Sequence, residues 1–189
     1  TDVWTSIASG QFTIEMWIYL ESTSMLNGYG ATVISSRATG DNSNSFYALG
    51  WTGNNGVAEL YSNINTGFTH YFNSSGTYGA AAFPVGQWVH IATCRDGSNV
   101  VRSYMNGTKI AQTTDSTSIN VATGLIGGHD YGNFDSYQTF YLNDLRIYNT
   151  AKYTADSFTL PNLDVTGGNS FHLPMDGNSQ VGHDKSGNG

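Results

Sequence analysis

Charged residues are scarce in this sequence, at 11% of its 189 residues against 39% hydrophobic residues. The chain holds three glutamates, Glu15, Glu21 and Glu59, whereas helical surfaces usually carry many more. Glycine, serine, threonine and asparagine are abundant instead, which is typical of short strands joined by many turns. The composition therefore predicts one all-β domain with almost no helix, and the length is ordinary for such a domain.

Basic residues and cysteines are also few. Seven lysines and arginines stand against 14 acidic residues, so no basic stripe can neutralise phosphates and a nucleic-acid partner is excluded. The sole cysteine, Cys94, allows no internal disulfide and leaves the redox compartment open. No hydrophobic run approaches the ~20 residues of a membrane span, so membrane insertion is not expected. The chain has neither a signal peptide nor an initiator methionine, and we expect it to be a piece of a longer protein.

The clearest predicted strand is Phe12–Leu20, where apolar residues alternate with others in the period of two that is typical of a strand. The apolar face comprises Phe12, Ile14, Met16, Ile18 and Leu20. The opposite face comprises Thr13, Glu15, Trp17 and Tyr19. We expect the apolar face to form one wall of the core.

Two consecutive β-hairpins are predicted between residues 87 and 112. Asp96-Gly97 and Asn106-Gly107 supply the positive φ angles of tight turns between alternating runs. A two-residue loop at the second turn pairs Met105 with Thr108, Tyr104 with Lys109, and Ser103 with Ile110. The sheet then has one apolar face on the core and one face in water. The apolar face holds Val101, Met105 and Ile110, and the wet face holds Arg102, Tyr104 and Lys109.

Further short strands follow the same pattern along the chain. They are Thr32–Ser36, Phe46–Thr52, Val57–Asn63, Phe68–Phe72, Leu125–Ile126 and Gln138–Asn149. About nine or ten strands at this spacing predict a two-sheet antiparallel β-sandwich, jelly-roll-like, over residues 1–163. Ala151–Leu163 is predicted to be a turn-rich or short helical tail. Residues 164–189 form a Gly/Asn/Ser-rich segment, a linker to a further copy or its start.

Four segments together resemble the laminin G-like domains of the concanavalin A-like lectin/glucanase superfamily. They are Phe12–Ile18, Gln87–Ala92, Tyr104–Gly107 and Leu142–Asn149. The next segment, Ala151–Phe158, is similar to an ending in bacteriophage structural proteins, and Asp184–Gly189 is similar to the opening of many such domains. The resemblance implies a non-catalytic binding, adhesion or assembly module of a phage fibre, appendage or surface decoration. The alternative is a bacterial secreted or cell-surface carbohydrate-binding lectin-like module, with its location extracellular rather than in a virion.

Glycoside hydrolase activity is the less favoured alternative, and we expect no enzyme. Retaining glycosidases need two carboxyl groups about 5 Å apart, and the resemblance implies a Glu-x-Asp-x-x-Glu motif on one strand of the superfamily's glucanases. None of the glutamates begins such a motif, although an aspartate pair from separate loops stays open. His90 and Cys94 lie on one strand with their Cα atoms ~13 Å apart, too far for a catalytic dyad.

Residues 128–137 form the loop richest in aromatic and acidic side chains: His129, Asp130, Tyr131, Asn133, Phe134, Asp135 and Tyr137. Tyr29 and Tyr78 lie in other polar loops. Sugar rings stack on aromatic side chains while Asn and Asp orient the hydroxyl groups, so these residues fit glycan recognition. A contact with other structural proteins of a particle or surface, with a second copy in a homo-oligomer, or a minor core under the loop fits the same residues.

Calcium is the one cofactor that the sequence leaves open. Oxygen-rich loops suit calcium, and the candidate ligands are Asp130, Asn133 and Asp135, or Asp41, Asn42 and Asn44. Such clusters are also common turn formers. The histidines have no zinc-binding spacing. For Asp144, the acid that the family resemblance matches, we expect a pair with Arg146 or a backbone contact.

Overall fold

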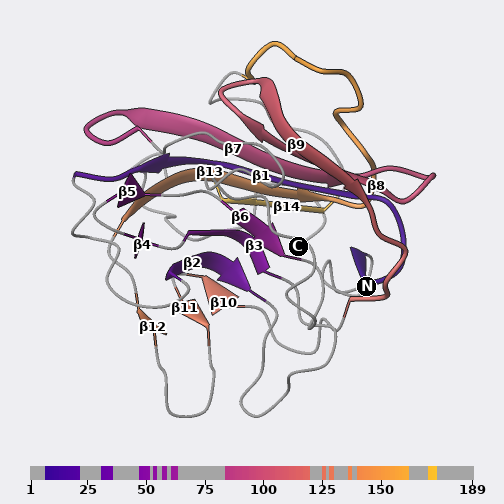
Figure 1. The fold of residues 1–189 in the computed structure, drawn as a ribbon, viewed down its shortest axis with the longest axis horizontal. Coiled ribbons are helices and arrows are strands. Elements are labelled where there is room, and N and C mark those ends of the chain that lie inside the picture. The colour runs from indigo at the N-terminus through magenta and orange to yellow at the C-terminus, as the bar shows by residue number, and fades with distance from the viewer. Residues whose placement is uncertain are drawn as a thin grey trace.

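A computed structural model gives the fold of the chain (Figure 1). It describes residues 7–21, 31–35, 47–51, 53–54, 57–58, 61–63, 84–119, 125–126, 128–129, 136–137, 140–161 and 170–173. The described strands all pair antiparallel and form two main sheets that face each other. The predicted all-β sandwich is confirmed. No helix in the described part of the chain is long and apolar enough to cross a membrane.

The larger sheet has six strands and brings together distant parts of the sequence. In spatial order they are β14 (Ser170–Leu173), β13 (Tyr141–Tyr148), β1 (Phe12–Tyr19), β7 (Trp88–Arg95), β8 (Val100–Met105) and β9 (Thr108–Thr114). The first described strand, β1, therefore lies in the middle of the sheet, between β7 and β13. Strand β14 comes from the predicted C-terminal segment and extends the sheet at one edge.

The smaller sheet has four strands, in the order β10 (Leu125–Ile126), β2 (Ala31–Ser35), β3 (Tyr47–Trp51) and β6 (Tyr61–Asn63). Two further pairs are β4 (Gly53–Asn54) with β5 (Val57–Ala58), and β11 (Gly128–His129) with β12 (Ser136–Tyr137). Figure 1 shows β10, β11 and β12 beside β2, on the side away from the larger sheet. The predicted strand Phe68–Phe72 lies outside the described residues.

The core lies between the two sheets. Phe12, Ile14, Met16, Ile18 and Leu20 have no exposed surface, and they pack with Ile34 of β2. Val89 and Ile91 of β7 and Leu145 and Ile147 of β13 join the same cluster. The predicted wall of the core is therefore confirmed, because side chains two residues apart on a strand share one face.

The two hairpins form with partly different turns. Asn106 and Gly107 have φ angles of 48° and 76°, as a two-residue hairpin turn requires, and the first two predicted pairs are confirmed. Ser103 pairs with Ala111, so its predicted pairing with Ile110 is wrong. A bulge at this point lets Ile110 and Ala111 both pack against the core, which two consecutive residues of a regular strand cannot do.

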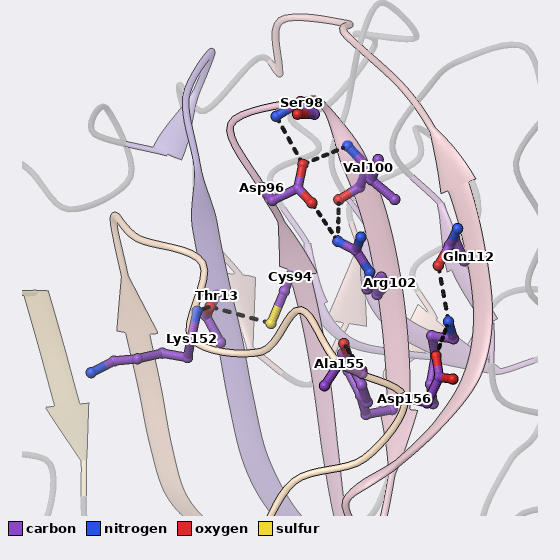
Figure 2. A network of polar contacts seen from close by, with 12 residues as sticks. Thr13, Cys94, Asp96, Ser98, Val100, Arg102, Gln112, Lys152, Ala155 and Asp156 are labelled. Atoms are coloured by element: carbon purple, nitrogen blue, oxygen red, sulfur yellow. Dashed lines mark hydrogen bonds and ion pairs between the residues drawn. The ribbon is translucent and has the colours of Figure 1, made fainter.

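The turn between β7 and β8 is longer than predicted. It spans Asp96–Asn99, and the positive φ angle, 60°, falls on Asn99 instead of Gly97. Asp96 organises the turn, because its Oδ1 accepts hydrogen bonds from the backbone N–H groups of Ser98 (2.9 Å) and Val100 (3.0 Å) (Figure 2). Aspartate commonly shapes turns in this way.

The outer face of the larger sheet is not wet throughout, so the prediction for Tyr104 is wrong. Residues 151–161 cross this face as an irregular segment without helix, the orange trace above the sheet in Figure 1. Phe158 N donates to Gly107 O (2.8 Å), and Lys109 N donates to Asp156 O (2.8 Å). Beneath the segment Tyr104 has no exposed surface. We call residues 151–161 the covering segment.

Candidate functional site

The outer face of the larger sheet is built in rows that the strand register fixes. Side chains of paired residues lie side by side on one face of an antiparallel sheet. From one end to the other, successive rows across β13, β1 and β7 hold Tyr148–Thr13–Cys94, Arg146–Glu15–Ala92, Asn143–Trp17–His90 and Tyr141–Tyr19–Trp88. The covering segment lies over the first rows and leaves the last row open. Each half is a candidate site.

Glu15 is the centre of a buried polar network under the covering segment. It is 2% exposed, and His90 and Arg146 beside it are 1% and 3% exposed. The Tyr153 hydroxyl donates to Glu15 Oε2 at 2.5 Å, and His90 Nε2 lies 3.4 Å from the same oxygen. Arg146 Nη1 lies 3.9 Å from Glu15 Oε1. Glutamate oxygens can thus accept several donors at once.

The environment of Glu15 decides its charge. Burial by itself raises the pKa of Glu15, but the hydrogen bonds from His90 and Tyr153 and the charge of Arg146 outweigh burial, so the pKa lies below its ordinary value. Glu15 is therefore ionised at neutral pH. The pKa of Tyr153 is raised, by burial first and then by the carboxylate of Glu15, so Tyr153 acts as a hydrogen-bond donor.

Arg146 joins this network to Asp144. Its Nε and Nη2 donate to the two carboxylate oxygens of Asp144, at 2.9 and 2.5 Å, which confirms the predicted pair. Asp144 stands where the register between β1 and β13 shifts, and its φ angle is 55°. Aspartate tolerates this left-handed conformation better than most residues. The backbone of Asp144 is thus irregular at the residue whose carboxylate accepts both hydrogen bonds from Arg146.

The covering segment is held to the sheet by hydrogen bonds at its start and near its middle, and Figure 2 shows Lys152 and Ala155 at these two places. Thr13 Oγ1 donates to Thr150 O (2.8 Å) and accepts from Lys152 N (2.9 Å). The Tyr104 hydroxyl donates to Ala155 O (2.9 Å). Under the segment, burial raises the pKa of Cys94 to about 12, so its thiol stays protonated and is a poor nucleophile.

The enclosed network has the geometry of a structural centre. The carboxylates of Glu15 and Asp144 are both bound by Arg146, and the covering segment lies between Glu15 and solvent. A general acid or base must lie within hydrogen-bond reach of the substrate. Glu15 and Asp144 are buried and held by Arg146, so neither carboxylate is open to a substrate. Among the described residues, no group of three or more His, Cys, Asp or Glu side chains could hold a metal ion.

The last row is open and wholly aromatic. Tyr19 lies between Trp88 and Tyr141, and its ring centroid is 5.8 Å from each of theirs. Trp88 is 44% exposed and Tyr141 is 51% exposed. The Tyr141 hydroxyl donates to Glu21 Oε1 at 2.8 Å. We call Tyr19, Trp88 and Tyr141 the aromatic row.

Sequence reasoning missed the aromatic row, because it searched loops for exposed aromatic side chains and these three lie on strands. The available signal was the position of Tyr19 and Trp88 at the ends of their predicted strands; Tyr141 gave none, because the predicted strand Gln138–Asn149 extends beyond it. The pairing of β1 with β7 and β13, which brings them together, is not visible in a single sequence.

The loop at residues 128–137 is described only at its ends. Gly128 pairs with Tyr137 and His129 with Ser136, so the two ends of the loop are joined as a short hairpin next to β2. The hairpin lies on the side of the smaller sheet, far from the outer face of the larger one (Figure 1). Outside the described residues lie the other predicted ligands: Asp130, Tyr131, Asn133, Phe134 and Asp135, together with Tyr29, Tyr78, Asp41, Asn42 and Asn44.

Two antiparallel sheets packed around one core define a β-sandwich of the lectin type. Residues 1–156 match the family described as the concanavalin A-like lectin/glucanases superfamily (Laminin_G_3), and the chain belongs to this family. No curated protein matches the sequence.

Solved structures share this fold at low sequence identity. A candidate carbohydrate-binding protein from Bacteroides ovatus has a TM-score of 0.64 at 14% identity, over 95% of this chain and 50% of that one. The CBM40 module of a Ruminococcus gnavus IT-sialidase, bound to α2,3-sialyllactose, has a TM-score of 0.57 at 18% identity, over 79% and 81% of the two chains. The NanB sialidase of Streptococcus pneumoniae has a TM-score of 0.54 at 15% identity, over 81% and 25%. The chain thus spans half the length of the first protein and a quarter of the sialidase.

Proposed function

We propose that the chain is a non-catalytic carbohydrate-binding module of a secreted or cell-surface protein. The observation that carries the proposal is the fold shared with the Ruminococcus gnavus module. The match covers about four fifths of both chains, so it includes most of a module that is bound to α2,3-sialyllactose in its solved structure. Fold alone does not assign a function, and the chemistry of the described residues has to agree with it.

Four of the described carboxylates support binding without catalysis. Hydrolysis of a glycosidic bond uses a pair of carboxyl groups that reach the substrate. Glu15 and Asp144 are buried on Arg146, Asp96 organises a turn and bonds Arg102, and Asp156 pairs with Lys109. These groups already have partners within the fold.

The assembly role in a phage particle stays a prediction from sequence. The comparisons favour the alternative reading, a secreted or cell-surface lectin-like module, because the similar structures include a carbohydrate-binding module and a candidate carbohydrate-binding protein. Binding by the loop at residues 128–137, with or without calcium at Asp130, Asn133 and Asp135, also stays a prediction.

A binding screen without and with calcium tests the proposal. The protein is run by affinity electrophoresis through gels that contain xylan, mannan, arabinan or β-glucan, and titrated with sialyllactose. We expect retardation or heat release with at least one sugar and no release of reducing ends. A stable homo-oligomer that responds to none of these sugars would instead favour the assembly role. Reducing ends released by the wild type, and lost in a variant of one carboxylate, would establish a hydrolase.

A further inference from the structure

The aromatic row has the shape of a narrow ledge at the open end of the larger sheet. Its three side chains come from neighbouring strands in the order β7, β1, β13. Because neighbouring strands lie about 4.8 Å apart, the row is about 10 Å long, the length of a short oligosaccharide. The ring planes are tilted by 58° and 73° to one another, so the ledge is ridged instead of flat.

The exposed area of the row fits a small ligand. Since an aromatic residue buries about 150–250 Å² when fully enclosed, the exposed fractions of Trp88 and Tyr141 leave on the order of 200 Å² of the two residues in water. A stable protein interface buries about 800 Å² on each partner. A protein partner would need a much larger apolar surface, whereas two or three sugar rings are covered by an area of this size.

Polar groups at the edge of the row indicate the kind of sugar. Tyr141 holds the carboxylate of Glu21 beside the rings through a 2.8 Å hydrogen bond. A carboxylate accepts hydrogen bonds from sugar hydroxyl groups, and it repels an anionic sugar. The formal charge of −7 on the whole chain acts in the same direction.

We propose that the aromatic row, with Glu21 at its edge, binds a neutral pyranose chain on the outer face of the larger sheet. The inference rests on the proposed carbohydrate-binding function and assigns the ligand class and the place. C–H faces of the sugar rings stack on Trp88 and Tyr141, and hydroxyl groups donate to Glu21. The site lies on the outer face of the larger sheet, whereas β11 and β12, the two ends of the predicted loop, lie beside the smaller sheet (Figure 1).

Two matched double variants test the place of binding. One is Trp88→Ala with Tyr141→Ala in the aromatic row, and the other is Tyr131→Ala with Phe134→Ala in the predicted loop. Both remove two aromatic rings. Wild type and variants are titrated calorimetrically with cellohexaose, xylohexaose, mannohexaose and α2,3-sialyllactose. We expect wild type to bind a neutral hexasaccharide more tightly than sialyllactose, and the row variant to bind it at least tenfold more weakly.

The outcomes separate this inference from the proposed function. If the wild type binds none of the four sugars, the proposed function fails for these probes and the inference fails with it. If the wild type binds and the row variant keeps its affinity within twofold, the row is not the site, and the proposed function stands. Tighter binding of sialyllactose than of any neutral sugar overturns the assignment of a neutral ligand.

A measurement on the wild type avoids dependence on the folding of the variants. N-bromosuccinimide oxidises exposed tryptophan side chains, and peptide mass spectrometry reports each site. We expect a saturating concentration of the bound hexasaccharide to slow oxidation of Trp88 at least threefold. Trp17, whose indole nitrogen is buried, is the internal reference. Unchanged oxidation of Trp88 in the presence of bound sugar would overturn the inference.

Discussion

Tyr153 donates a 2.5 Å hydrogen bond to the buried carboxylate of Glu15 and so ties the covering segment to the centre of the larger sheet. Tyr153 also stacks on Phe158, with ring centroids 3.5 Å apart and planes 4° from parallel. Both rings pack against a second, small apolar cluster of Ala92, Cys94 and Tyr104. Strands β1, β7 and β13 are therefore buried on both faces over most of their length and are open at the end that carries the aromatic row.

The first prediction concerns this hydrogen bond. Tyr153→Phe keeps the ring and removes the donor, which leaves a buried carboxylate with one partner fewer. We expect the free energy of unfolding to fall by about 2 kcal/mol, because hydrogen bonds to charged groups contribute about 1.5–3 kcal/mol. Chemical denaturation at pH 7 measures it. Tyr141→Phe is the matched control, since it removes an exposed hydrogen bond to Glu21 and should change stability by less than about 0.5 kcal/mol. Equal losses in the two variants would contradict the prediction.

The second prediction is a pH dependence that belongs to Glu15. Its pKa in the folded protein lies below the ordinary value of 4.5, so the folded state favours the ionised form. The stabilisation is fully present above pH 4.5 and is lost as the pH falls through the lower folded value. We expect the stability difference between wild type and Glu15→Gln to be constant near neutral pH and to shrink below pH 4.5. Denaturation at several pH values between 3 and 7 measures this difference, and a difference that does not vary with pH would contradict it.

These two predictions concern residues whose role the sequence only half reveals. Alternation from Phe12 to Leu20 is enough to predict the strand and its core face, because burial on one side imposes a period of two. It does not predict that the other face, with Glu15, is also buried. That depends on the covering segment, whose residues 151–161 have no periodic pattern and were predicted to be turns or a short helix.

The two candidate sites also differ in how far the sequence could predict them. The pair of Asp144 with Arg146 could be predicted, because the two residues are close in sequence and opposite in charge. The aromatic row could not, because Tyr19, Trp88 and Tyr141 are far apart in sequence and meet through strand pairing alone. Composition did identify residues 128–137 as a loop, and the pairing of Gly128 with Tyr137 shows that its ends meet.

The third prediction concerns the close approach between Gly107 and the covering segment. Gly107 has a φ angle of 76°, and a Cβ atom there would lie 2.5 Å from Phe158 O. Gly107→Ala therefore strains the turn and pushes the segment away. Gly86→Ala is the control, because Gly86 has a φ angle of 72° but nothing within 4 Å of an added Cβ. The left-handed conformation costs a non-glycine residue about 1–2 kcal/mol, and both variants share this loss.

We expect Gly107→Ala to be less stable than Gly86→Ala by at least about 1 kcal/mol, since it must also resolve the contact with Phe158. A second measurement reports the segment itself. Cys94 lies beneath it and should react with a thiol reagent faster in Gly107→Ala than in wild type, and at the wild-type rate in Gly86→Ala. Equal stability and equal Cys94 reactivity in the two variants would show that the added methyl group does not push the segment away, and would contradict the prediction.

The fourth prediction separates the two roles of Asp144, its backbone conformation and its pair with Arg146. At this position asparagine tolerates the φ angle of 55° and still accepts a hydrogen bond from Arg146. Glycine tolerates the φ angle but has no acceptor, and alanine neither tolerates the φ angle nor has an acceptor. We expect stability to fall in the order wild type, Asp144→Asn, Asp144→Gly, Asp144→Ala. Asp144→Gly should lose about 3 kcal/mol, because it leaves the buried Arg146 with Glu15 at 3.9 Å as its remaining carboxylate.

Asp144→Ala should lose about 1 kcal/mol more than Asp144→Gly, which is the strain of a left-handed residue with a side chain. Denaturation of all four proteins at pH 7 gives both differences. The order of the variants is the main test, because the loss of the Asp144 carboxylate beside Arg146 and the strain of the backbone are separate effects. If Asp144→Gly were more stable than Asp144→Asn, backbone strain would dominate and the pair with Arg146 would add little stability. If Asp144→Ala and Asp144→Gly were equally stable, the backbone of the bulge would relax in the alanine variant. The positive φ angle of Asp144 would then follow from its pair with Arg146 instead of from the strand register.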